Sequence, residues 1–269
     1  MGMPVKKYSI PLETKQHIAN RYKTITKAIN RSLWKSVSDS AHSFYVGSYG
    51  RGTAITTSDI DILIEVPRDF YVCNTYSTYN PQSRLLQVVK NAILESYPRS
   101  SVKGDGQVVV INFSDGMKME VLPAIREDDY FCGAIYHYPD THMGGKWLST
   151  NPKAEQEAIA QKDKQSNGLY KNTCKHMRYI RDNYFSSYHL SGIVIDSFVF
   201  NVIDNWRYLV EGEPIVPYNE TYEESLLKRF NQLSYNGYIP FNITAPGSNI
   251  PVDTNNSILC LGKVLNKMV

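Results

Sequence analysis

Two aspartates and one glutamate are the side chains of this sequence best suited to binding a divalent cation. Asp59 and Asp61 are separated by one residue in SDIDILIEV, and Glu120 lies in KMEVLPAI. On a β-strand, residues two apart point to the same face, so the two aspartates would lie side by side. Their repulsion at about 4 Å is about 1 kcal/mol in water and several-fold larger in a less polar cleft. A hard divalent cation with oxygen ligands would relieve it.

Glu120 extends this acidic pair if its strand lies next to that of the aspartates. Met119 and Val121 flank it, and we expect both to face a core while Glu120 projects from the opposite face. The isoleucines around Asp61 predict the same alternation for the strand 60–66. Three carboxylates brought together suit two Mg²⁺ ions about 3.5–4 Å apart, an arrangement used for in-line phosphoryl or nucleotidyl transfer.

A glycine-rich segment precedes the aspartates. Gly47 and Ser48 follow a predicted strand at 42–46 and open the sequence GSYGRGTA. A turn with a glycine and a hydroxyl can approach phosphate oxygens closely. A plain loop before an exposed strand edge is the alternative, but the combined spacing of GSYGRGTA and SDID favours a catalytic site.

The hydrophobic pattern predicts the elements that position these residues. We expect helices over 11–37 and 83–97, strands over 42–46, 60–66, 107–113 and 118–122, and an irregular connector over 124–152. Further helices are expected over 153–185, with a break near Asn167-Gly168, over 192–211 and 221–235, and at the C-terminal end after a polar stretch, 236–256. Because the strands come first and the helices second, we expect an α/β lobe followed by a helical lobe, with a cleft between them.

The composition narrows the class of protein. The chain has 269 residues, a net charge of +3 and 42% hydrophobic residues, enough for a core and too few charges for an acidic or basic tail. There is no apolar run long enough for a membrane span, and we expect no secretory leader. Four scattered cysteines without a CxxC pair are typical of reduced thiols, so we expect a cytoplasmic protein.

These motifs resemble the nucleotidyltransferase superfamily of the DNA polymerase β type. Within it, GSYGRGTA, SDIDI and the MEVLPAI strand are similar to the cGAS/DncV-like nucleotidyltransferases, or CD-NTases. The resemblance implies an α+β, bilobal fold. A catalytic lobe, residues 1–150, would contain a mixed β-sheet and a long N-terminal spine helix, and residues 151–269 would form a C-terminal helical lobe.

The resemblance also implies a role for each candidate residue. Gly47 and Ser48 would hold the triphosphate of a donor nucleotide. Asp59, Asp61 and Glu120 would be the catalytic metal ligands, although the family more often has aspartate at the third position. Two Mg²⁺ ions are implied, and Mn²⁺ can substitute. The helical lobe would add nucleotide contacts from two further residues. These are Lys175 and Ser197, with Ser187 as the rival for the serine.

The function implied is synthesis of a cyclic di- or trinucleotide second messenger from ATP and other NTPs, in bacterial anti-phage signalling of the CBASS type. The expected partner is a separate effector protein that senses the product; neither a membrane nor a nucleic acid is required. Alternatives are a nucleotidyltransferase that modifies a protein, RNA or small-molecule acceptor, and a catalytically silent nucleotide sensor.

Overall fold

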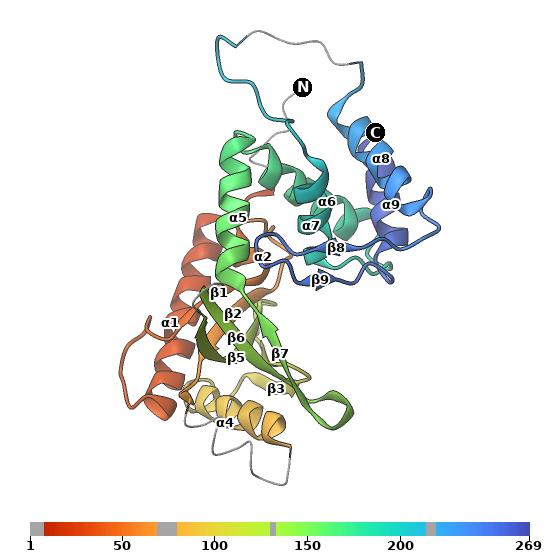
Figure 1. Ribbon diagram of the computed structural model, residues 1–269. Coiled ribbons are helices and arrows are strands. Elements are labelled where there is room, and N and C mark those ends of the chain that lie inside the picture. The colour runs from red at the N-terminus through yellow and green to blue at the C-terminus, as the bar shows by residue number, and fades with distance from the viewer. Residues whose placement is uncertain (1–7, 69–79, 130–132, 214–218) are drawn as a thin grey trace. The chain divides into compact units, whose positions relative to one another are not determined.

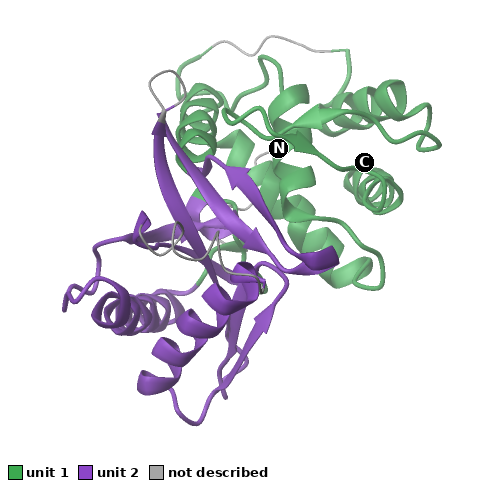
Figure 2. Ribbon diagram, turned by 60° about the horizontal axis from the view of Figure 1, so that its bottom comes forward, with its two compact units in different colours: residues 1–10, 51–58, 153–269 green, residues 11–50, 59–152 purple. Residues whose placement is uncertain are grey.

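The chain forms two compact units in the computed structural model, which describes residues 8–68, 80–129, 133–213 and 219–269. Unit 1 comprises residues 1–10, 51–58 and 153–269, and unit 2 comprises residues 11–50 and 59–152 (Figure 2). The segment 51–58 therefore belongs to unit 1, although the chain on both sides of it belongs to unit 2.

A mixed β-sheet is the centre of unit 2 (Figure 1). Its strands are β1 (Ser43–Val46), β2 (Ile60–Glu65), β3 (Ser101–Asp105), β4 (Val108–Asn112), β5 (Lys118–Asp129), β6 (Gly133–Asp140) and β7 (Lys146–Thr150). The order is β1-β2-β5-β4-β3, with β6 paired to β5 and β7 paired to β6. Only the pair β2 and β5 is parallel among the described strands; the others are antiparallel. The mixed sheet expected from the sequence is confirmed.

Two amphipathic helices cover one face of this sheet. They are α1 (Leu12–Leu33), the expected long N-terminal helix, and α4 (Pro81–Ser96). The helices contact each other, α1 also contacts β2, and α4 also contacts β3, β4 and β5. The expected alternation of β2 is present, because Ile60, Ile62 and Ile64 are all buried. This apolar packing fixes which face of β2 is left for Asp61.

The prediction of an irregular connector over 124–152 was wrong. Strand β5 continues to Asp129 and pairs with β6, which in turn pairs with β7. Glycine, histidine and proline in this stretch interrupt the alternation of hydrophobic and polar residues by which a strand is predicted. Tyr136, fully buried in the middle of β6, packs with Leu63 and Ala124 in a small core cluster, and tyrosine favours such half-buried strands. Strand β3 was also missed.

Unit 1 is mainly helical. Its helices are α5 (Pro152–Gln165), α6 (Leu169–Tyr184), α7 (Gly192–Val202), α8 (Tyr222–Ser234) and α9 (Ile258–Met268). The expected break between α5 and α6 is confirmed: Asn167 and Gly168 have φ of 53° and 88°, outside the helical region. Helix α7 ends at Val202, earlier than the predicted residue 211, because Asp204 takes a left-handed conformation with φ of 45°.

The core of unit 1 is apolar and rich in aromatic rings. The rings of Phe198, Phe230 and Phe241 pack against one another with centroids 6.2–6.3 Å apart. Between α8 and α9, the polar stretch includes a short pair of strands, β8 (Ile243–Thr244) and β9 (Pro251–Val252). Across the parts of the chain that the structure describes, every helix is too short or too polar to cross a membrane.

Candidate active site

Asp61 and Glu120 lie at paired positions on adjacent parallel strands. In the register of β2 and β5, Asp61 is opposite Glu120, and Ile60 is opposite Met119. Met119 and Val121 are fully buried, so Glu120 points to the other face of the sheet, as the sequence predicted. The structure therefore brings these two acidic residues to the same place on one face.

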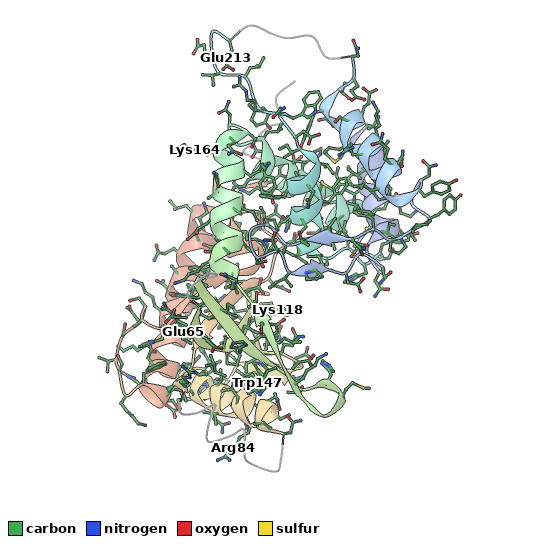
Figure 3. The ribbon with its side chains drawn as sticks, viewed as in Figure 1. Glu65, Arg84, Lys118, Trp147, Lys164 and Glu213 are labelled. Carbon is green, nitrogen blue, oxygen red and sulfur yellow. The ribbon has the colours of Figure 1, made fainter. Side chains whose placement is uncertain are left out.

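Asp59 extends the acidic group from the residue just before β2. Its side chain is 46% exposed, and its Oδ2 accepts a hydrogen bond of 2.9 Å from Nζ of Lys118. The same ammonium lies 2.6 Å from Oε1 of Glu120. Burial would lower the pKa of Lys118, but the hydrogen bonds that its ammonium donates to Glu120 and Asp59 raise it above its ordinary value. Lys118, which is labelled in Figure 3, is therefore a positively charged side chain in contact with two of the carboxylates. This contact was not predicted from the sequence.

Gly47 is fitted closely to Asp61. It opens the short helix α2 (Gly47–Arg51), which takes the place of the turn expected from the sequence. Its φ of 57° is in the left-handed region, and a Cβ added there would lie 2.6 Å from Cγ of Asp61 and closer still to Oδ2. Ser48 follows it in α2, and the ring of Tyr49 packs on Tyr45 with centroids 4.8 Å apart. Only a glycine allows the carboxylate of Asp61 to keep this position beside α2.

The chemistry of the donor set suits a divalent cation. Carboxylate oxygens are the ligands that Mg²⁺ and Mn²⁺ prefer, and three carboxylates come from the first residues of β2 and β5 and the residue just before β2. Within the described residues, however, no three His, Cys, Asp or Glu side chains converge in a ready-made metal cage. Asp59 and Glu120 are instead turned toward the ammonium of Lys118, which takes the position between them.

The two remaining predicted residues belong to unit 1. Lys175 lies half-buried on α6, and Ser197 lies fully buried on α7. Among the described residues, the hydroxyl of Ser197 has no hydrogen-bond partner, which is unusual for a buried polar group. Ser187, the rival serine, is exposed in the turn after α6.

A buried cluster of charged side chains ties the segment 51–58 to the helices of unit 1. Arg51 Nε donates to Oδ2 of Asp196 at 2.9 Å, and Arg51 Nη1 donates to Oε2 of Glu155 at 3.0 Å. Arg178 donates to both carboxylate oxygens of Asp196, at 2.7 and 2.9 Å, and the hydroxyl of Thr53 donates to Oδ2 at 3.0 Å. Residues 51–58 make up most of the chain between Ser48 and Asp59 in the sequence.

The electrostatics of this cluster depend on its arginines. Burial would raise the pKa of Asp196, but the guanidinium groups of Arg178 and Arg51 hold it below its ordinary value. Burial raises the pKa of Glu155 despite the opposing effect of Arg51. This cluster was not predicted from the sequence. Its only signal was the arginine within GSYGRGT, because the partners lie more than 100 residues away.

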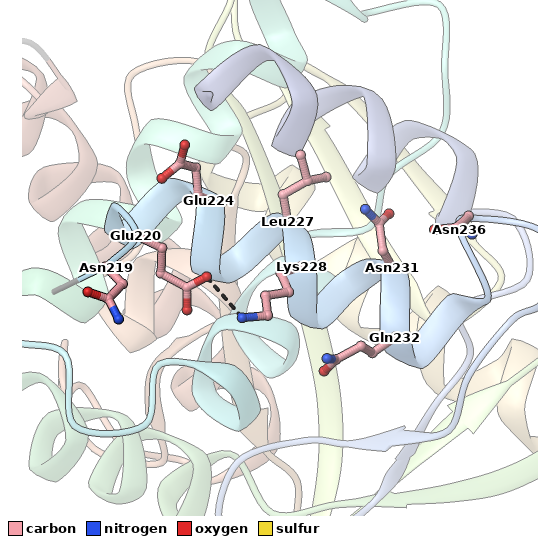
Figure 4. A pocket seen from close by; sticks show the side chains of 8 residues that line it. All are labelled: Asn219, Glu220, Glu224, Leu227, Lys228, Asn231, Gln232 and Asn236. Carbon is pink, nitrogen blue, oxygen red and sulfur yellow. Dashed lines mark hydrogen bonds and ion pairs between the residues drawn. The ribbon is translucent and has the colours of Figure 1, made fainter.

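A separate pocket lies along α8 in unit 1 (Figure 4). Its volume is about 580 Å³, and its lining includes Asn219, Leu227 and Asn236 together with Glu220 and Lys228, whose side chains form an ion pair of 3.1 Å. None of the predicted site residues lines it. The acidic and amide side chains that line this pocket come from α8 and the residues flanking it. They include no pair of a nucleophile and a general base that would indicate a catalytic site.

Comparison with known proteins gives a family match. Residues 6–163 match the model of the Second Messenger Oligonucleotide or Dinucleotide Synthetase domain. A curated relative, the cyclic AMP-AMP-AMP synthase of an Acinetobacter species, is 27% identical over 140 residues, which are 52% of this chain and 39% of that protein. The match thus spans about two fifths of the relative's length.

Solved structures share the fold over nearly the whole chain. The CdnE cyclic dinucleotide synthase of Elizabethkingia meningoseptica, solved with GTP and Apcpp, has a TM-score of 0.62 at 16% identity, with 97% of this chain and 98% of that chain covered. The DncV cyclic AMP-GMP synthase of Vibrio cholerae has a TM-score of 0.62 at 14% identity, with 97% and 85% covered. At these identities the likeness establishes the fold.

Proposed function

The chain belongs to the Second Messenger Oligonucleotide or Dinucleotide Synthetase family, and on this premise we propose that it is a metal-dependent nucleotidyltransferase that joins NTPs into a cyclic di- or trinucleotide. The observation that carries the proposal is the register of the sheet. It sets Asp61 opposite Glu120, next to Asp59 and beside a glycine that leaves room for the carboxylate of Asp61. Acidic residues gathered in this way suit phosphoryl chemistry.

The donor nucleotide places its triphosphate against Gly47 and Ser48. The glycine permits close approach of the backbone, and the serine adds a hydroxyl donor. By the resemblance drawn from the sequence, Lys175 and Ser197 are proposed to contact the triphosphate as well. The unpartnered hydroxyl of Ser197 is consistent with such a role, because a ligand would satisfy it.

The reaction forms one bond and breaks one. A ribose 2′- or 3′-hydroxyl oxygen of the acceptor nucleotide attacks the α-phosphorus, the bond between the α-phosphorus and the bridging oxygen breaks, and pyrophosphate leaves. We propose that Glu120 orients this hydroxyl and helps to remove its proton, either as the base or through the metal. Asp59, Asp61 and Glu120 would hold Mg²⁺, two ions by the resemblance, with Mn²⁺ able to substitute. When bound, the metal neutralises phosphate charge and makes the hydroxyl more acidic.

A second transfer within the linear intermediate would close the ring. The relatives named above make cyclic products, which favours this outcome over transfer to a protein, RNA or drug. We further propose that the product is a second messenger of anti-phage defence in the cytoplasm, sensed by a separate effector protein. The catalytic lobe of this enzyme would be residues 1–150 and the helical lobe residues 151–269.

The test is to incubate the purified protein with all four NTPs and Mg²⁺ or Mn²⁺, treat the products with phosphatase and determine their masses. The proposal expects a phosphatase-resistant product with the mass of a cyclic di- or trinucleotide. A nucleotide attached to a protein, RNA or small-molecule acceptor would replace the proposal with the first alternative. Nucleotide binding without any product would favour a silent sensor.

A further inference from the structure

Lys118 is a basic residue within an otherwise acidic site. It lies on β5 two residues before Glu120, so both side chains project from the same face of the sheet. Asp61 on β2 is opposite Glu120, and Asp59 is the residue just before β2. Asp61 and Glu120 are thus paired by the register of the strands, and Lys118 and Asp59 are joined by a side-chain hydrogen bond.

The contacts of Lys118 join the two strands. Its ammonium lies 2.6 Å from Glu120 and 2.9 Å from Asp59, within hydrogen-bonding distance of both. Without a cation, carboxylates held this close would repel and turn away from each other. The ammonium of Lys118 supplies the missing positive charge. A single charged nitrogen thus lies where a divalent cation would share the same two carboxylates.

The side chain of Lys118 is able to leave this position. It is 35% exposed, and it carries its charge at the end of a flexible four-carbon chain. Arg178 in unit 1 offers a contrast, since it is fully buried and bound to Asp196 through two nitrogens. A part-exposed lysine can exchange its carboxylate partners for water at small cost, which a buried arginine cannot do.

We propose that Lys118 is the resident counter-ion of the acidic site: it holds Asp59 and Glu120 together in the metal-free protein and must leave when a divalent cation binds. This inference depends on the proposed function, because it assumes that the acids are metal ligands. Its consequence is that Lys118 lowers the metal affinity of the nucleotide-free protein. Lys118 is thus a positioning residue, acting through the two carboxylates.

The test measures Mn²⁺ binding to the full chain without nucleotide, from the free-Mn²⁺ signal in electron paramagnetic resonance. We expect Lys118→Met to bind Mn²⁺ at least tenfold more tightly than the wild type. Without metal, this variant should also melt at a lower temperature than the wild type, and saturating Mn²⁺ should remove the difference. Lys118→Arg, which keeps the charge, should retain the weaker binding. Lys103→Met, at an exposed lysine on β3, is the matched control and should bind like the wild type.

The outcomes separate this inference from the proposed function. In one outcome, Lys118→Met binds Mn²⁺ no more tightly than the wild type, and Asp59→Ala/Asp61→Ala abolishes the binding seen in the wild type. This result would overturn the role of Lys118 and leave the metal site intact. If neither the wild type nor Lys118→Met bound Mn²⁺, both the role of Lys118 and the proposed metal site would be overturned. If Lys118→Met bound Mn²⁺ more tightly, and this binding were lost when Asp59 and Asp61 were also replaced by alanine, the role of Lys118 and the metal site would both be supported.

Discussion

Asp61 and Glu120 face each other across two adjacent parallel strands, although 58 residues separate them in the sequence. Their positions follow from the apolar residues around them. Ile60 and Ile62 on β2, and Met119 and Val121 on β5, are all buried and fix the register and the face of each strand. A slip of one residue in either strand would move its carboxylate to the opposite face.

The first prediction concerns Gly47. Gly47→Ala would place a methyl group against the carboxylate of Asp61 and would require an alanine in the left-handed region, which costs about 1–2 kcal/mol. We expect a lower melting temperature and loss of most nucleotidyl transfer, because Asp61 must move. The control is Gly116→Ala, which has a similar backbone requirement at φ of 85° but open space around the added methyl group. It should lower stability and leave the activity unchanged. Full activity in Gly47→Ala would show that the position of Asp61 is not critical.

The second prediction concerns Glu120. Glu120→Gln keeps the size of the side chain but removes its charge and its ability to accept a proton. We expect kcat to fall by about 100-fold or more, the usual range for loss of a general base. Glu127→Gln, an exposed position on the same strand, is the control and should change kcat by less than about twofold. If Glu120→Gln retained wild-type kcat, Glu120 would not be the third acid.

The third prediction concerns the buried charges of unit 1. Arg51→Met leaves Glu155 buried without its arginine, so the free energy of unfolding should fall by about 3 kcal/mol in urea titrations. Adding Glu155→Gln removes the unpaired charge, and the double variant should regain part of this loss. If the double variant were no more stable than Arg51→Met, the ion pair with Glu155 would not be the source of the effect.

The fourth prediction concerns Ser197. Its hydroxyl is buried and unpartnered among the described residues, so Ser197→Ala should leave the free energy of unfolding unchanged or raise it by about 1 kcal/mol. If the hydroxyl contacts the triphosphate, the same variant should raise KM for the NTP several-fold. Ser187→Ala, at an exposed position, should change neither quantity. A raised KM in Ser187→Ala but not in Ser197→Ala would transfer the role to the rival serine.

Much of the fold around the site could be predicted from local patterns. The alternation of Ile60, Ile62 and Ile64 gave the buried face of β2, and the glycine after Asn167 gave the break between α5 and α6. The stretch 124–152 could not be predicted in the same way. Its glycines, histidines and prolines resemble loop composition, and its strands are defined by pairing with β5 and with each other.

Within the site, the acids could be predicted and their positive neighbours could not. Asp59 and Asp61 are recognisable from their spacing and the motif before them. The contacts of Lys118 depend on the register between β2 and β5, and the pairing of Arg51 with Asp196 joins residues 145 apart. Such contacts are decided by tertiary packing, which local sequence patterns do not contain.

The most direct test of the account compares the wild type with Asp59→Ala/Asp61→Ala, using α-³²P-labelled NTPs and Mg²⁺ or Mn²⁺. Labelled product and released pyrophosphate are measured, and circular dichroism checks that the double variant is folded. We expect a phosphatase-resistant labelled product from the wild type and none from the double variant. The same product from a folded double variant would contradict the assignment of the acidic site.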